Sequence, residues 1–318
     1  MCIRDSSRPL LAAESTRRLF TYSCIHRRLD VMTVSRTQLP GPSPPPSSHK
    51  SEVRNRVWDE LRYVAIPDSR FDHDYSSFIC DFVGSNDAGR HLIGLPCYSK
   101  AQKLFIAPDN CLQELRYQAL KDGKTVLCTT YGIRRGFFLL DPKVIPERKW
   151  ELASMLDGME KLGRHVTLTE MRQSNLQVSM MITGTGAINH KGLRFGKGHG
   201  FFDLEWAMLY SIGAVTKDTK TIALVHECQV LDEELKGEQW DTGCDFVVTN
   251  QRVIEVSGAS KPGCGILWDR LEKGMMEDIE PLRELKNIIF PPEVKSPQEQ
   301  LDFSEEARLY MDYAAFDY

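Results

Sequence analysis

A glycine-rich stretch in the middle of the chain carries the residue types best suited to chemistry. It reads RFGKGHGFFD over residues 194–203, with Lys197 and His199 between glycines. Glycines let a backbone adopt positive φ and approach phosphate oxygens closely, and Lys197 and Arg194 would donate charge-assisted hydrogen bonds to them. Asp203 would lie in the first turn of the next helix, where it would cap that helix or hold Mg²⁺ bridging phosphates.

The spacing of these glycines matches neither of two well-known phosphate-binding motifs. A Walker A loop requires G-x-x-x-x-G-K-[ST], and a dinucleotide-binding loop requires G-x-G-x-x-G. The stretch contains neither pattern. Taken alone, it therefore fits a phosphate cradle and a tight glycine turn equally well.

The elements around the stretch place it where ligands bind in α/β proteins. The apolar run over residues 176–183 predicts a buried strand, and FFDLEWAMLYSIGA predicts a helix that begins near Gly200. In open α/β sheets, ligands bind at the carboxyl ends of strands, where loops lead into helices. The free N–H groups and the helix dipole at such a point favour an anion.

The rest of the chain alternates between helical and strand patterns. Val53, Val57 and Leu61 share one face of a helix near the start of the folded part. Further helices are predicted over residues 111–123 and 147–163, and strands over residues 125–130 and 221–231. Residues 245–256 are predicted to form a strand, a turn and a second strand. This alternation indicates a three-layer α/β/α domain with a mainly parallel sheet, extending over residues 49–290.

The two ends of the chain do not have the composition of a folded core. Residues 1–48 contain seven arginines and three acidic residues and end in LPGPSPPPSS, which is typical of a proline-rich linker. This leader is expected to be disordered; it has the composition of an organelle transit peptide, or is an unstructured or mistranslated extension. Residues 291–318 are predicted to form an acidic tail.

Composition limits the functional classes. The net charge of −4 gives no general reason to expect a nucleic-acid or membrane partner. The nine cysteines form no C-x-x-C pair, so we do not expect a metal site built from cysteines. Scattered, unpaired cysteines fit a protein of a reducing compartment best. We expect a cytoplasmic monomer, or a mitochondrial or plastid protein if the arginine-rich leader is genuine.

The segment MITGTGAINHKGLRFGKGHGFFD resembles the signature of the 5-formyltetrahydrofolate cyclo-ligase (5,10-methenyltetrahydrofolate synthetase) family. That signature is approximately v-P-G-x-A-F-D-x-x-G-x-R-L-G-x-G-x-G-Y-Y-D. The matching positions are Gly186, Ala187, Gly192, Arg194, Gly196, Gly198, Gly200 and Asp203. The closing segment of the family is matched by Asp241, Asp245 and Thr249. The K-x-x-x-R helix that contacts nucleotide phosphates is matched by KSEVR.

This resemblance implies a NagB/RpiA/CoA-transferase-like fold with ATP and Mg²⁺ in a cleft and a reduced folate as substrate. The implied reaction is the ATP-dependent cyclisation of 5-formyltetrahydrofolate to 5,10-methenyltetrahydrofolate, with release of ADP and phosphate. Lys197 and Arg194 would be catalytic, and Asp203 would bind the metal. The implied nucleotide-binding residues are Lys50, Arg54, Gly196, Lys197, Gly198, His199, Gly200, Phe201 and Phe202.

Several positions depart from the family pattern. Phe201 and Phe202 replace two tyrosines, Ile188–Asn189 replaces F-D, and Trp240 replaces the histidine before Asp241. The G-I-x-E-P and S-x-x-x-E-x-x-T segments of the family are not recognisable. A non-catalytic cyclo-ligase-like domain that binds a nucleotide, RNA or a protein is therefore the alternative function. An isomerase or transferase of the same broad fold, acting on a phosphorylated small molecule, is a third.

Two further pairs of residues allow two interpretations each. Arg134 and Arg135 lie among aromatic residues and would either meet a polyanion, such as a folate glutamate tail, or form an exposed turn. Asp241 and Asp245 would either serve the site or pin the loop before the last strand pair.

Overall fold

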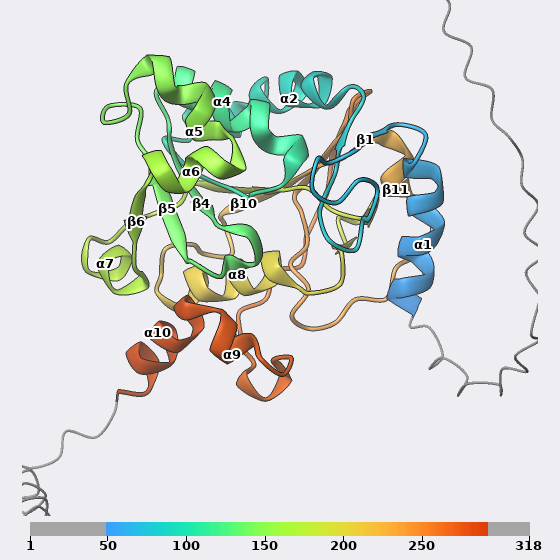
Figure 1. Ribbon diagram of the computed structural model, residues 1–318. Coiled ribbons are helices and arrows are strands. Elements are labelled where there is room, and N and C mark those ends of the chain that lie inside the picture. The colour runs from blue at the N-terminus through green and yellow to red at the C-terminus, as the bar shows by residue number, and fades with distance from the viewer. Residues whose placement is uncertain (1–48, 292–318) are drawn as a thin grey trace, which may run out of the picture. The chain divides into compact units, whose positions relative to one another are not determined.

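An eight-stranded sheet forms the centre of the fold (Figure 1). The computed structural model of the chain describes residues 49–291, so the predicted leader and the tail from residue 292 lie outside the described residues. The strand order is β13-β12-β10-β7-β3-β4-β5-β6. The strands are β3 Lys103–Ile106, β4 Thr125–Thr129, β5 Phe137–Leu140, β6 Arg164–Val166, β7 Met180–Thr183, β10 Lys220–Leu224, β12 Phe246–Val248 and β13 Val253–Glu255.

The five central strands of this sheet, from β12 to β4, are parallel to one another. In the register of the sheet, Ile222 of β10 lies opposite Ile182 of β7 and Phe246 of β12. Strands β13, β5 and β6 join the two edges antiparallel. All four residues of β7 are buried, as expected for a parallel strand covered on both faces. The predicted α/β class with a mainly parallel sheet is therefore confirmed.

Helices cover both faces of the sheet. Figure 1 shows α2, α4 and α5 on one side and α8 and α10 on the other. The α-helices are α1 His49–Leu61, α2 Ser85–Ile93, α3 Pro96–Lys100, α4 Gln113–Lys121, α5 Trp150–Ser154, α6 Leu156–Leu162, α7 Leu168–Gln173, α8 Phe201–Ser211, α9 Met275–Asp278 and α10 Glu280–Ile289. The apolar face predicted for α1 is buried, through Val53, Val57 and Leu61.

Two smaller sheets complete the described part. One pairs β1 (Ala65–Ile66) with β2 (Asp81–Phe82), and the other has the order β11-β8-β9. Its strands are β8 Ala187–Asn189, β9 Arg194–Phe195 and β11 Val230–Leu231. The second sheet holds both ends of the loop that precedes the glycine stretch.

The helix predicted over residues 147–163 is broken in the structure. Met155 has extended backbone angles (φ −79°, ψ 150°) and separates α5 from α6. The break lets α6 fold back against α5. The two helices pack so closely that a Cβ on Gly158 would lie only 1.7 Å from the carbonyl oxygen of Leu152. The period-based prediction was therefore wrong at this point.

The strand predicted over residues 221–231 was also too long. Strand β10 ends at Leu224, and residues 227–229 form a short 3-10 helix before β11. The side chain of His226 caps that helix by accepting the N–H of Cys228 at 3.2 Å. This local hydrogen bond interrupts the strand although the apolar pattern continues through it.

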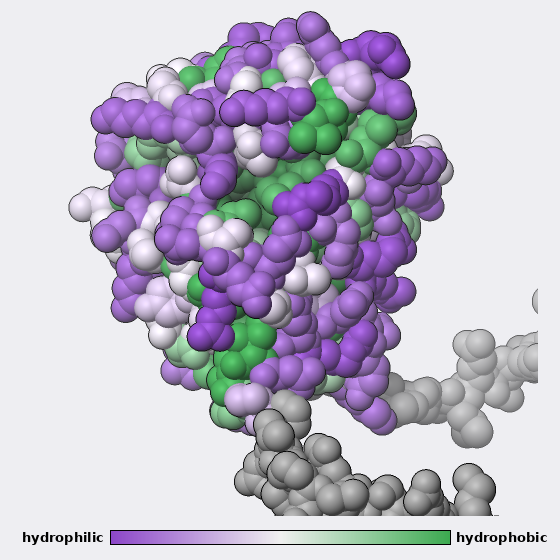
Figure 2. All heavy atoms as spheres, turned by 90° about the vertical axis from the view of Figure 1, so that its left-hand side faces the viewer, coloured by the Kyte–Doolittle hydropathy of each residue, from purple (hydrophilic) through white to green (hydrophobic). Residues whose placement is uncertain are grey.

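The surface of the domain is mixed in polarity. Figure 2 shows a face that is mostly hydrophilic, with apolar side chains gathered in separate patches. Within residues 49–291, no helix has both the length and the apolar composition needed to cross a membrane.

Candidate functional site

The glycine stretch forms a loop between β9 and the start of α8, at the end of the sheet where ligands bind in α/β proteins. Gly198 (φ +128°) and Gly200 (φ +66°) have backbone angles that other residues rarely adopt. Gly200 is the N-cap residue of α8, and none of the described side chains caps this helix. The backbone N–H groups in the first turn of α8 are therefore open to an anionic ligand.

Lys197 projects from this loop into a partly buried position. Its Nζ donates a hydrogen bond to the carbonyl oxygen of Ser77 at 2.9 Å and lies 4.3 Å from the ring centre of Tyr131. Within the part of the chain that the structure describes, no carboxylate lies within ion-pair distance of it. Burial lowers the pKa of Lys197, while Asp109 and Glu205 act in the opposite direction. A negatively charged ligand would supply the missing counter-charge.

Two cations reach the same loop from α1. The guanidinium of Arg54 lies beside Gly198, with Nη2 3.7 Å from the position of a Cβ on that glycine. Burial lowers the pKa of Arg54, and its side chain donates only a long hydrogen bond, 3.5 Å, to Ser51 among the described contacts. Lys50, by contrast, forms an ion pair with Asp241 at 2.6 Å. Arg54 is therefore the α1 cation that is better placed to receive an anion.

Arg194 and Asp203 form a buried ion pair at the base of the loop. The Nη2 of Arg194 lies 2.6 Å from Oδ1 of Asp203, and the arginine side chain is only 4% exposed. The same carboxylate oxygen accepts the backbone N–H of Thr242 at 2.8 Å. Asp203 therefore binds Arg194 and does not cap α8. Burial raises the pKa of Asp203, and the charge of Arg194 opposes that shift.

The metal role predicted for Asp203 rests on its second oxygen. Oδ2 lies beside Gly200, 3.9 Å from the position of a Cβ there, and Oδ1 is occupied as described. Across residues 49–291, no three His, Cys, Asp or Glu side chains are grouped closely enough to hold a metal ion by themselves. A Mg²⁺ site at Asp203 would need ligand phosphates for most of its coordination, which is usual for this ion.

A cavity adjoins the loop at the carboxyl ends of β3, β4 and β7. Lys197, Phe201 and Arg194 contribute to its wall, together with two acidic residues that the sequence did not single out, Asp109 and Glu205. The cavity therefore combines cations from the loop with acids from the sheet and from α8.

In the wall of this cavity, Asp109 is half-buried and Glu205 is buried. Asp109, which follows β3, accepts the N–H of Gly184 at 2.7 Å, and burial raises its pKa. Glu205, on α8, accepts a short hydrogen bond from the hydroxyl of Thr129, and burial raises its pKa to about 8. Glu205 is therefore largely protonated near neutral pH.

The aromatic residues predicted for the site have separate roles. Phe201 faces the cavity and stacks against His199, with ring centres 5.3 Å apart. Phe202 packs into the core against Phe105 and beneath the guanidinium of Arg194, 4.4 Å from it. Both rings line the cavity, but Phe201 is the more exposed of the two and Phe202 is buried.

The adjacent arginines near the cavity do not form a shared anion site. Arg135 makes a two-pronged ion pair with Glu160, and Arg134 lies 3.7 Å from Asp278 of α9. Asp245 likewise has a structural role, because it accepts the N–H of Thr221 and pairs with Lys261.

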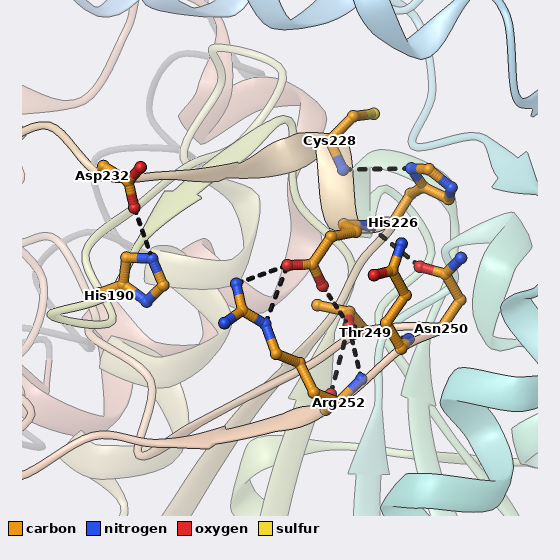
Figure 3. Close-up of polar contacts among 9 residues, drawn as sticks. His190, His226, Cys228, Asp232, Thr249, Asn250 and Arg252 are labelled. Atoms are coloured by element: carbon orange, nitrogen blue, oxygen red, sulfur yellow. Dashed lines mark hydrogen bonds and ion pairs between the residues drawn. The ribbon is translucent and has the colours of Figure 1, made fainter.

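A polar network lies at the ends of β10 and β12 (Figure 3). Glu227 accepts hydrogen bonds from Arg252 and from the hydroxyl of Thr249, and its own N–H donates to Asn250 at 3.1 Å. Two residues farther along, Gln229 donates to the carbonyl of Thr185 at 2.6 Å. Gln229 thereby holds the turn between β7 and β8.

This fold and loop define an α/β domain with a cationic, glycine-rich site between a strand and a helix. The model of the 5-formyltetrahydrofolate cyclo-ligase family matches residues 46–250 of the chain. The chain therefore belongs to that family, as its glycine signature predicts.

The chain is also similar to curated proteins called methenyltetrahydrofolate synthase domain-containing protein. The Danio rerio protein is 31% identical over 243 residues, covering 75% of this chain and 62% of its own length. The Mus musculus protein is 32% identical over 240 residues (74% and 63%), and the Homo sapiens protein is 32% identical over 242 residues (74% and 61%). The chain thus spans about three fifths of the length of these relatives.

A solved structure of the same family is also similar to the chain. It is the NMR structure of Aquifex aeolicus 5,10-methenyltetrahydrofolate synthetase, which is 19% identical, with a TM-score of 0.41. The match covers 66% of this chain and 95% of that one.

Proposed function

We propose that the chain binds ATP on the glycine loop and cyclises 5-formyltetrahydrofolate to 5,10-methenyltetrahydrofolate, releasing ADP and phosphate. The observation that carries this proposal is a pair of cations, Lys197 and Arg54, that have no carboxylate partner among residues 49–291 and lie at a loop that leads into an uncapped helix. Family membership supports the reaction. The cationic loop supports the binding of the polyphosphate that this reaction requires.

The residues around the loop suit the phosphates of ATP. Gly198 and Gly200 let the backbone approach the phosphate oxygens, and the N–H groups of α8 point toward them. Each charge-assisted hydrogen bond from Lys197 or Arg54 would contribute about 1.5–3 kcal/mol. Asp203, through Oδ2, would hold Mg²⁺ together with the phosphates, and the bound ion would neutralise part of their charge.

The formyl-bearing end of the folate would enter the cavity next to the loop, whose volume of about 80 Å³ holds only part of such a ligand. Phe201 and Tyr131 provide apolar surface there, and Asp109 and Glu205 provide polar groups. The formyl oxygen of the folate would accept the γ-phosphoryl group of ATP, and N10 would then attack the activated carbon, with loss of phosphate. Lys197 belongs both to the loop and to the cavity wall, so it is placed where the two substrates would meet.

The experiment that tests this proposal follows the absorbance of the methenyl product. Full-length protein with ATP, Mg²⁺ and 5-formyltetrahydrofolate should give a new near-ultraviolet band that is absent when any component is omitted. The Lys197→Ala variant should lose about 10- to 100-fold in kcat/KM for ATP, because it removes one charge-assisted phosphate contact. Lys191→Ala is the matched control, since Lys191 pairs with Glu234 at an exposed position. No turnover by pure, folded protein would refute the proposal.

A second candidate function is nucleotide binding without folate turnover. It is favoured by the ion pairs of Lys50 with Asp241 and of Arg194 with Asp203, which neutralise two of the four cations near the loop. Binding of ATP in calorimetry without formation of the methenyl band would establish this alternative. Turnover at an ordinary enzymatic rate would exclude it.

A further inference from the structure

A second cavity adjoins the glycine loop; it shares Gly200 and Asp203 with the first, and its other lining residues are different. Gly198, His199 and Gly200 form its edge on the loop, and its volume is about 230 Å³. Most of its remaining wall is apolar and includes Leu204, Trp240, Ile266, Leu271 and Met275. The cavity is therefore a largely apolar compartment directly beside the predicted phosphate site.

Much of this wall comes from a segment outside the family match. The match ends at residue 250, whereas Ile266, Leu271 and Met275 belong to the segment that leads into α9. Figure 1 shows this part of the chain on the side of α8 away from the sheet. The segment therefore supplies a cavity wall beside the loop that the matched region alone does not provide.

The segment is firmly attached to the rest of the domain. The indole N–H of Trp206 donates to the carbonyl of Pro262 at 3.0 Å, in the core. Lys261 forms a buried ion pair with Asp245 at 2.6 Å. Farther along, Glu284 of α10 accepts the backbone N–H groups of Leu168 and Thr169. The segment that forms the cavity wall is therefore held in place by buried and specific contacts.

The charges around the loop indicate what enters the cavity. Arg54 lies beside Gly198, which borders the cavity, and Lys50 is paired with Asp241, the residue next to Trp240. A phosphate chain held by the loop and by Arg54 would thus leave its organic end beside Trp240. With a volume of about 230 Å³, the cavity lies below the range of about 300–1,000 Å³ typical of whole ligands. It suits one ring system rather than a whole nucleotide.

We propose that this second cavity binds the base of the nucleoside triphosphate whose phosphates lie on the glycine loop, with Trp240 and the segment Pro262–Met275 as its walls. The inference rests on the proposed function, because it takes the phosphates to be on that loop. The base would stack on or against Trp240 and contact the apolar side chains of the segment. Trp240 is then a residue that determines affinity for the base and does not contact the phosphates.

Isothermal titration calorimetry of the full chain with Mg²⁺-ATP and with Mg²⁺-tripolyphosphate tests this assignment. Wild-type protein should bind ATP at least tenfold more tightly than tripolyphosphate, since base stacking on an aromatic side chain supplies a difference of about that size. Trp240→Ala should lose about tenfold in ATP affinity and leave tripolyphosphate affinity unchanged, and Trp240→Phe should retain most of the ATP affinity. Met275→Trp, which fills the cavity from the segment, should weaken ATP binding alone.

Trp268→Ala is the matched control, because Trp268 belongs to the same segment but packs against Phe290. The Trp268→Ala variant should bind both ATP and tripolyphosphate with wild-type affinity. Equal binding of ATP and tripolyphosphate to wild-type protein would overturn the base cavity while leaving the phosphate site intact. A loss of both affinities in Trp240→Ala would also overturn it, because Trp240 would then act through the loop. Binding of neither ligand to wild-type protein would refute the proposed function, and this inference with it.

Discussion

Replacement of Glu205 by glutamine should change the way in which the stability of the domain depends on pH. The carboxyl group is buried, accepts a hydrogen bond from Thr129, and has no cation within ion-pair distance among the described residues. Burial raises its pKa from 4.5 to about 8. Glutamine has nearly the same shape as the protonated acid, so Glu205→Gln should preserve the packing and remove the titration.

The sign and size of the effect follow from linkage. Between pH 4.5 and about 8, the folded protein keeps the proton on Glu205 and the unfolded chain loses it, so the free energy of unfolding falls as the pH rises. The full shift of about 3.5 pH units, at about 1.36 kcal/mol for each unit, corresponds to about 5 kcal/mol. Most of this, about 4 kcal/mol, should appear between pH 5 and pH 9.

Urea denaturation at pH 5, 7 and 9, followed by circular dichroism, measures this difference. The stability of Glu205→Gln relative to wild type should rise by about 4 kcal/mol from pH 5 to pH 9. Glu114→Gln, on the exposed side of α4, is the matched control and should follow the wild-type curve at each pH. Parallel pH profiles for wild type and Glu205→Gln would refute the reasoning, because the carboxyl would then be ionised in the folded state.

Two other perturbations test the local structure around the site. Burial lowers the pKa of His226, so stability should fall as the pH drops below about 6.5, where the unfolded chain takes up the proton first. His226→Asn should keep the cap on residues 227–229 and remove this loss, as measured by thermal melts at pH 5 and 7. Gly158→Ala should destabilise the domain by about 1–3 kcal/mol or more, because its Cβ would overlap the carbonyl of Leu152. Gly89→Ala, in α2 with open space around it, should instead stabilise by about 0.5–1 kcal/mol; equal effects of the two alanines in urea denaturation would contradict the close packing of α5 and α6.

The centre of the fold could be predicted from the sequence because its parallel strands are buried on both faces. Segments such as MMIT in β7 and TIAL in β10 are therefore continuous apolar runs, and glycines end the helices that join them. Strand β6 has only three residues, RHV, of which two are exposed, so it leaves no apolar pattern to recognise. The break at Met155 depends on contact between two helices and is likewise absent from the local pattern.

The candidate site shows the same division between local and distant causes. The glycine loop could be predicted because its backbone angles depend on its own residues. Asp109 and Glu205 were missed because they meet only through the packing of α8 against the end of β3. The one signal for Glu205 was an acidic residue, besides Asp203, in a helical stretch that is otherwise apolar, FFDLEWAML. The pairing of Lys50 with Asp241 joins residues 191 positions apart, which no spacing rule would find.

The ion pairs at the loop show how the folded domain accommodates several cations close together. Four cations, Lys50, Arg54, Arg194 and Lys197, lie near the loop. Asp241 pairs with Lys50 and Asp203 with Arg194, whereas Asp109 and Glu205 act on Lys197 only from beyond ion-pair distance. The paired cations hold the loop and α1 in position, because a buried charge needs a partner. Lys197 and Arg54 have no ion-pair partner among the described residues, and burial lowers the pKa of each. A bound phosphate would oppose this effect of burial on the pKa, and its binding should stabilise the folded domain by an amount that grows with the logarithm of the ligand concentration above Kd.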